Sequence, residues 1–127
     1  MMKTYQLMTR DVIAVRADTC LDEVARLLER HRIQSVPVIN EHEQVIGLVR
    51  RLDIFMQSGE NGQTAAGATA ADVMKHRVTC VQEEDEISDV AWLVARRGLG
   101  MLPVLREGRL VGVISRSDLV RLYAVVG

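Results

Sequence analysis

The chain contains one pattern twice, and this duplication limits the folds open to it more than any other feature. When the two halves are aligned, apolar, proline, glycine and acidic residues coincide in one register. The matching pairs are Met8 and Met74, Val12 and Val78, Pro37 and Pro103, Gly47 and Gly112, and Asp53 and Asp118. The pairs from Gly47 onward match only if the second copy is one residue shorter, where its segment REGR aligns with EHEQ of the first copy. This segment is expected to be a polar turn, and turns tolerate such deletions. Because chance rarely places proline, glycine and aspartate in one register, we expect two copies of one folding unit.

Apolar residues at helical spacing predict the first helix of each copy. These stripes are Leu21, Val24, Ala25, Leu28 and His31 in the first copy, and Ile87, Val90, Ala91 and Val94 in the second. Thr19, with Asp22 three residues later, approximates a capping box at the start of the first helix. Gly98 follows the second stripe and is the expected C-cap.

Short apolar runs rich in valine and isoleucine predict the strands. In the first copy, residues 12–15 form one such run, and residues 35–39 and 45–49 suit two strands of a hairpin. The corresponding hairpin runs of the second copy are residues 101–105 and 110–114. A final helix is expected to open near Asp53 and near Asp118. The pattern predicts an α+β fold of two tandem βαββα repeats packed with pseudo-twofold symmetry.

The repeats set the domain organisation, and the composition excludes several classes of function. We expect the first repeat at residues 5–57, a flexible linker rich in small polar residues at 58–68, and the second repeat at 69–124. The net charge of -1 disfavours a nucleic-acid-binding regulator, and one Trp, two Tyr and one Phe are too few for base stacking. No apolar run is long enough for membrane insertion.

The spacing of the two cysteines and the missing enzyme motifs limit the kinds of metal site and enzyme activity that the chain could have. Cys20 and Cys80 lie far apart without CxxC spacing, so they predict reduced thiols in a cytoplasmic protein rather than a zinc site. The sequence holds no P-loop, no G-x-S-x-G and no H-E-x-x-H. We therefore expect no enzyme activity and no metal site.

The order of the pieces resembles a known family. A Met-Thr or Met-Lys turn, an amphipathic helix, a V-P-V or L-P-V strand and then GLVRRLD or GVISRSD follow one another in each copy. Each copy resembles a cystathionine β-synthase (CBS) domain, and residues 5–124 together resemble a CBS pair, or Bateman module. The resemblance implies a homodimeric regulatory module without a required cofactor. Such a module binds AMP, ADP, ATP or S-adenosylmethionine between its repeats and transmits a conformational signal to an unknown partner. The alternative is a dimerising interaction module that binds no ligand.

The second copy carries the sharper candidate site, at Ser115 and Asp118. A carboxylate can accept hydrogen bonds from both hydroxyls of a ribose, and Ser115 offers a hydroxyl to a phosphate or ribose oxygen. The same S-x-x-D pattern is also a helix capping box, and the two roles can coexist. The residues that the resemblance adds are Ile114 and Arg116 from the second copy, and Ile13, Ile33, Gln34, Ser35 and Pro37 from the first.

A second, weaker site is implied around Asp53. Arg50 stands where the family pattern has serine or threonine, and arginine is bulky and always charged. It could reach a phosphate, or it could pair with Asp53 and fill the cleft. The other residues that the resemblance implies for this site are Thr79, Leu99, Gly100, Met101 and Pro103.

Basic residues and one tryptophan complete the candidates. Residues 31–32, 50–51 and 75–77 and Arg116 carry histidine, lysine or arginine and suit either a phosphate or a solvated surface. Trp92 occupies the repeat position held by Arg26, off the apolar stripe. It predicts either a contact surface or a place in the core.

Overall fold

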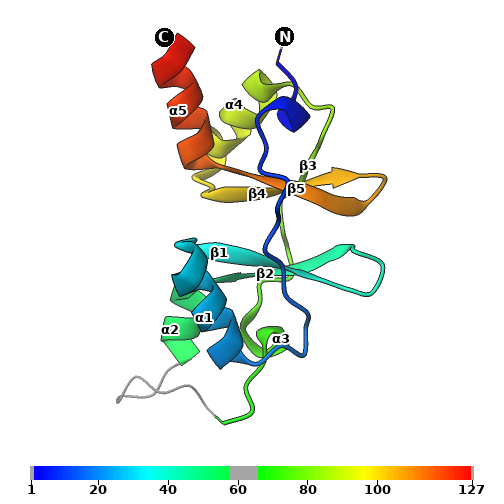
Figure 1. Cartoon of the computed structure of the whole chain (residues 1–127), viewed down its shortest axis with the longest axis vertical. Helices are drawn as coiled ribbons and strands as arrows, with labels where there is room; N and C mark the ends of the chain where they lie inside the picture. Colours follow the sequence, from blue (N-terminus) through cyan, green and yellow to red (C-terminus); the bar gives the residue numbers. More distant parts are fainter. Residues whose placement is uncertain (1, 58–65, 127) are drawn as a thin grey trace. The chain divides into compact units, whose positions relative to one another are not determined.

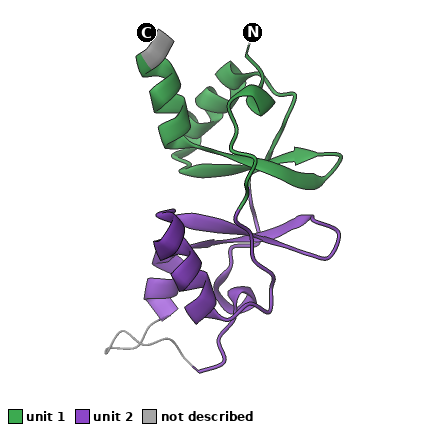
Figure 2. Ribbon diagram, viewed as in Figure 1, with its two compact units in different colours: residues 1–12, 79–127 green, residues 13–78 purple. Residues whose placement is uncertain are grey.

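The computed structural model describes residues 2–57 and 66–126 and has the expected mixture of helices and small sheets (Figure 1). The chain divides into two compact units (Figure 2). Unit 1 comprises Met1–Val12 and Thr79–Gly127, and unit 2 comprises Ile13–Val78. The α+β class is therefore confirmed. The first segment of each sequence repeat packs in the unit that holds the body of the other repeat. Residues 58–65 of the expected linker lie outside the described residues.

Unit 2 is a two-stranded antiparallel hairpin with its helices on one side (Figure 1). Its elements are α1 (Leu21–His31), β1 (Ser35–Ile39), β2 (Val45–Arg50), α2 (Arg51–Gln57) and α3 (Ala70–Val73). Val36 pairs with Val49 and Pro37 with Leu48 in the hairpin. The buried core of this unit consists of Val15, Leu21, Val24, Leu28, Val36, Val38, Val49 and Ala70.

Unit 1 repeats this plan with one more short strand. Its elements are η1 (Thr4–Gln6), β3 (Val81–Gln82), α4 (Ile87–Arg97), β4 (Met101–Arg106), β5 (Arg109–Ser115) and α5 (Arg116–Val126). The sheet order is β3-β4-β5, with β3 parallel and β5 antiparallel to β4. The buried core consists of Met8, Val81, Ile87, Val90, Val94, Leu102, Val104 and Ile114.

The predicted helix stripes are largely confirmed, but their ends differ from the expectation. Leu21, Val24 and Leu28 are buried on α1, whereas Ala25 and His31 at the edge of the stripe are exposed. The capping box predicted at Thr19 is wrong, because its hydroxyl accepts the N–H of Arg16 and closes the preceding turn instead. The N-cap of α1 is Cys20, without a side-chain hydrogen bond. Gly98 is the C-cap of α4 in the left-handed region, as predicted.

The first strand of each copy is much shorter than predicted. Of residues 12–15, only Val15 forms a parallel bridge, with Val38. The Val15 N–H donates to the carbonyl of Pro37, and its own carbonyl accepts from Ile39. The chain then turns at Arg16, which ends the pairing. In unit 1 the equivalent segment is the two-residue strand β3.

The first segment of each repeat, which packs in the other unit, is called here the exchanged segment. A methionine of this segment packs against a glycine of the unit that receives it. Thr9 forms an antiparallel bridge with Val113 in unit 1, and Lys75 forms one with Leu48 in unit 2. A Cβ added to Gly112 would lie 2.5 Å from the Met8 sulfur, and one added to Gly47 would lie 2.5 Å from the Met74 sulfur. The glycine of each repeat is therefore required by close packing against the exchanged methionine.

Candidate functional site

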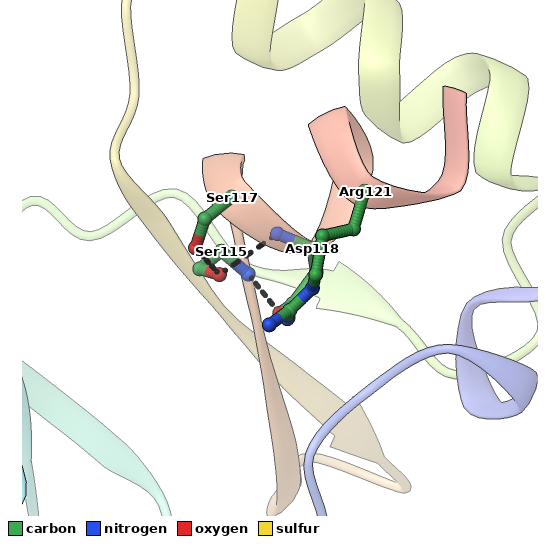
Figure 3. A network of polar contacts seen from close by, with 4 residues as sticks. All are labelled: Ser115, Ser117, Asp118 and Arg121. Atoms are coloured by element: carbon green, nitrogen blue, oxygen red, sulfur yellow. Dashed lines mark hydrogen bonds and ion pairs between the residues drawn. The ribbon is translucent and has the colours of Figure 1, made fainter. Parts of the chain in front are cut away.

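Ser115 and Asp118 form a reciprocal cap at the start of α5 (Figure 3). The Ser115 N–H donates to Asp118 Oδ2 at 2.8 Å, and the Asp118 N–H donates to Ser115 Oγ at 3.2 Å. Ser115 Oγ and Ser117 Oγ share a further hydrogen bond of 2.9 Å. The capping interpretation of the S-x-x-D pattern is thus confirmed, and Asp118 is held with its side chain nearly buried.

Arg121 reaches back one helical turn to the same carboxylate and forms an ion pair with Asp118 Oδ1. Its own side chain is 74% exposed. Each carboxylate oxygen has two acceptor positions. Among the described residues, Oδ2 accepts one hydrogen bond from Ser115 and Oδ1 accepts one from Arg121. One acceptor position therefore stays open on each oxygen, which is the arrangement that a cis-diol requires.

Asp53 at the start of α2 is equivalent to Asp118 but is held by a single neighbour. Its Oδ2 accepts hydrogen bonds from the Arg50 backbone N–H at 2.9 Å and from Arg50 Nε at 3.0 Å. Its Oδ1 accepts one from the Arg50 guanidinium at 2.7 Å. Of the two alternatives for Arg50, the structure therefore shows the pairing with Asp53.

The protonation of Asp53 reflects this pairing. Burial acts to raise the pKa of the Asp53 carboxyl, but the hydrogen bonds from Arg50 and the charges of Arg50 and Lys75 together lower it below its ordinary value. The Asp53 carboxylate therefore stays ionised, and its negative charge is balanced by positive charges of its own unit.

An arginine occupies the first position of each of these helices, Arg51 in α2 and Arg116 in α5. Its side chain contacts the end of the first long helix of the same unit, α1 or α4. The Arg116 guanidinium donates to the carbonyls of Gly98 at 2.9 Å and Leu99 at 3.1 Å. The Arg51 guanidinium donates to the carbonyls of Ile33 at 2.9 Å and Leu28 at 2.8 Å. A cation beside the carbonyl end of a helix is favourable. Both arginines are therefore engaged with main-chain carbonyls.

The family model for the CBS domain matches residues 5–59 and 70–125 of the chain. The chain belongs to the CBS domain family. An uncharacterized protein of Methanopyrus kandleri is 27% identical over 114 residues, covering 89% of this chain and 58% of that protein. The chain thus spans little more than half the length of this curated relative.

Solved CBS domain pairs have the same fold. The CBS domain pair of protein MJ0100, in complex with 5-methylthioadenosine and S-adenosylmethionine, matches with a TM-score of 0.87 at 21% identity and covers 100% of this chain and 99% of that one. CBSX2 in complex with AMP matches with a TM-score of 0.88 at 23% identity, covering 99% and 98%. At these identities the likeness shows the shared fold.

The CBS fold distributes the predicted site residues over both units. Unit 1 holds Ser115, Asp118, Ile114, Arg116, Thr79, Leu99, Gly100, Met101 and Pro103. Unit 2 holds Ile13, Ile33, Gln34, Ser35, Pro37, Arg50 and Asp53. Each predicted site combines residues of the two units, so its grouping stays a prediction.

The structure brings the residues that follow α4 to the start of α5, and the residues that follow α1 to the start of α2. The Arg116 N–H donates to the carbonyl of Gly100, and the Arg51 N–H donates to the carbonyl of Gln34, both at 2.9 Å. The side chain of Ile114 packs into the core of unit 1. Sequence reasoning missed Arg121, although its spacing of three residues from Asp118 on a predicted helix was the available signal.

Two negative findings hold for the part of the chain that the structure describes. No group of three or more histidine, cysteine, aspartate or glutamate side chains within residues 2–57 and 66–126 is placed to hold a metal ion. Over the same ranges, no helix has the length and apolar character needed to cross a membrane.

Proposed function

We propose that this CBS pair is a regulatory module that binds an adenosine-containing ligand, namely AMP, ADP, ATP or S-adenosylmethionine. The observation that carries the proposal is the pair of open acceptor positions on the Asp118 carboxylate. The solved relatives whose complexes contain AMP or S-adenosylmethionine support it. In this proposal Asp118 accepts hydrogen bonds from the ribose hydroxyls, because a carboxylate matches a cis-diol in geometry and charge.

The start of α5 supplies further groups for such a ligand. Ser115 offers a hydroxyl, and the first turn of this helix favours a phosphate or carboxylate group because the positive end of the helix dipole lies there. On the other unit, Ile13, Ile33, Gln34 and Ser35 are proposed to contact the adenine. The module acts in the cytoplasm without catalytic activity of its own. It signals to a partner by favouring the geometry that binds the ligand more tightly.

Thermal unfolding with each of the four ligands tests this function. A ligand at 100 times its dissociation constant stabilises the fold by about 2.7 kcal/mol. For a chain of this size, that corresponds to a rise in the unfolding midpoint of roughly 8 to 15 °C. The Asp118→Asn variant should keep the cap, since an amide oxygen also accepts the Ser115 N–H, but it should lose most of the rise.

The exposed Asp89, in the first turn of α4, offers a matched control. Asp89→Asn changes the net charge by the same amount and should keep the full ligand-induced rise. A rise that survives Asp118→Asn would place the ligand elsewhere. The absence of any rise with all four ligands at millimolar concentration would contradict the proposed function.

A dimerising interaction module is the second candidate function. Large apolar side chains are exposed on three helices: Leu52, Phe55 and Met56 on α2, Trp92 on α4, and Val120 and Tyr123 on α5. An apolar groove of about 490 Å³ lies between α4 and α5. Exposed apolar surface of this kind favours association with another protein, here a second copy. A dimer detected by sedimentation in a chain that binds none of the four ligands would favour this candidate.

A further inference from the structure

We propose that Arg50 closes the Asp53 position to ribose, so that the chain binds one adenosine ligand rather than two. This inference rests on the proposed function. It assigns to Arg50 the role of a specificity-determining residue, which blocks one of two equivalent carboxylates.

The first step is the count of hydrogen-bond acceptor positions. Asp53 Oδ2 already accepts two hydrogen bonds from Arg50, and Oδ1 accepts one. Only one position therefore remains, on Oδ1, whereas a cis-diol needs two. Asp118 accepts one hydrogen bond on each oxygen from the described residues and keeps a position open on both.

The second step is the strength of the bonds that a ribose would have to replace. The Arg50 side chain donates two parallel charge-assisted hydrogen bonds to Asp53, and these are stronger than bonds from neutral hydroxyls. Asp53 and Asp118 are equally buried, each 8% exposed, so the difference between the two carboxylates lies in their hydrogen-bond donors. Within residues 2–57 and 66–126, the guanidinium contact of Asp118 comes from Arg121, whose side chain is 74% exposed against 42% for Arg50 and can move aside at lower cost.

The third step is that the arginine is dispensable for the local fold. In unit 1, a serine at the equivalent position caps the helix through its N–H and its Oγ. The Arg50 N–H makes the same bond to Asp53 at 2.9 Å. A serine at position 50 keeps this N–H and adds the hydroxyl, so Arg50→Ser should preserve the start of α2 and leave at least one acceptor position open on each oxygen of Asp53.

Isothermal titration with AMP and, separately, with S-adenosylmethionine tests the inference by stoichiometry. We expect the unaltered chain to bind one ligand and the Arg50→Ser variant to bind two. The added site should disappear in the Arg50→Ser/Asp53→Asn double variant. The reciprocal Ser115→Arg variant places an arginine beside Asp118 and should weaken the original site by at least about tenfold. Thermal unfolding verifies that each variant is folded.

The outcomes separate this inference from the proposed function. Two ligands bound to the unaltered chain, or binding lost on Asp53→Asn alone, would overturn the inference and leave the function intact. A folded Arg50→Ser variant that binds only one ligand would do the same. If only the Arg50→Ser variant binds a ligand, the result would support the role of Arg50 in excluding ribose from Asp53. It would contradict the proposal that Asp118 binds a ligand in the unaltered chain. If neither the unaltered chain nor Arg50→Ser binds either ligand, the proposed function fails together with the inference.

Discussion

The starts of α2 and α5 are equivalent places in the two units, yet each holds its aspartate in a different way. At α5 a serine N–H and an exposed arginine one turn later share Asp118. At α2, Arg50 donates all three hydrogen bonds that Asp53 accepts from the described residues, one from its backbone and two from its side chain. The comparison teaches that the aspartate of this pattern is first a helix cap. In our proposal, the residue three positions earlier determines whether its carboxylate can also accept a ligand.

The two glycines that receive the exchanged methionines offer the strongest test of the equivalence. A Cβ at Gly112 would meet the buried Met8 and also the backbone carbonyl of Thr9 at 3.0 Å. The three atoms nearest to a Cβ at Gly47 all belong to the side chain of Met74, which is partly exposed. We expect Gly112→Ala to lower the free energy of unfolding by about 3 kcal/mol and Gly47→Ala by about 1 kcal/mol. Urea unfolding measures both, and equal losses would show that the two contacts are equally rigid.

The hydrogen bonds of the two aspartates predict the next largest difference. Asp53→Asn removes a carboxylate with three hydrogen bonds from Arg50, and we expect a loss of about 2 kcal/mol at neutral pH. Asp118→Asn should cost about 1 kcal/mol, because Asn keeps the bond to the Ser115 N–H and Arg121 is exposed. Chemical unfolding at pH 7 compares the two variants. A larger loss for Asp118→Asn would contradict the ranking.

The lowered pKa of Asp53 also predicts how stability depends on pH. A carboxyl whose pKa is lower in the folded state stabilises the fold fully above its unfolded value, which is about 3.9. This contribution is lost as the pH falls through the folded pKa. The difference in unfolding free energy between the unaltered chain and Asp53→Asn should therefore be constant from pH 7 to about pH 5 and shrink below about pH 4. A difference that does not change down to pH 2.5 would contradict the ion pair.

Much of the fold follows from local patterns. Apolar residues three and four positions apart located α1 and α4, since Leu21, Val24, Leu28 and Val90 are all buried. The β-branched runs located the hairpins, where Val36 pairs with Val49. These features were predictable because each depends on the spacing of residues within one short segment.

The remainder depends on contacts between distant segments. The leading segment of each repeat packs in the other unit, with Met8 against Gly112 and Met74 against Gly47, and no local pattern encodes this placement. The Arg116 guanidinium donates to the carbonyls of Gly98 and Leu99, which only the folded chain brings near, and its contact with a ligand stays a prediction. Thr19 lies in a sequence that is typical of a helix cap, but its hydroxyl accepts the N–H of Arg16 in the preceding turn.

The two helix-end arginines predict a smaller difference. Arg51 donates to two main-chain carbonyls and pairs with Glu29, and its side chain is 37% exposed, against 61% for Arg26. Arg116 donates only to carbonyls and is exposed. We expect losses of about 1.5 kcal/mol for Arg51→Ala and about 1 kcal/mol for Arg116→Ala, measured by urea unfolding. A loss of binding to AMP in Arg116→Ala, with stability unchanged, would instead indicate a direct ligand contact.

The smallest effect on folding is expected at Trp92 on α4, compared with Arg26 at the same repeat position on α1. Trp92 is 60% exposed, and its ring lies 4.8 Å from the Arg96 guanidinium carbon. Trp92→Ala should cost only about 0.5 kcal/mol of stability, and Arg26→Ala should be within about 0.5 kcal/mol of neutral. Self-association should distinguish them, because a buried tryptophan at an interface typically contributes more than about 1 kcal/mol to binding. If α4 contacts a second copy, sedimentation should show that Trp92→Ala weakens the dimer and Arg26→Ala does not. An unchanged dimer in Trp92→Ala would exclude this face of α4 from the interface.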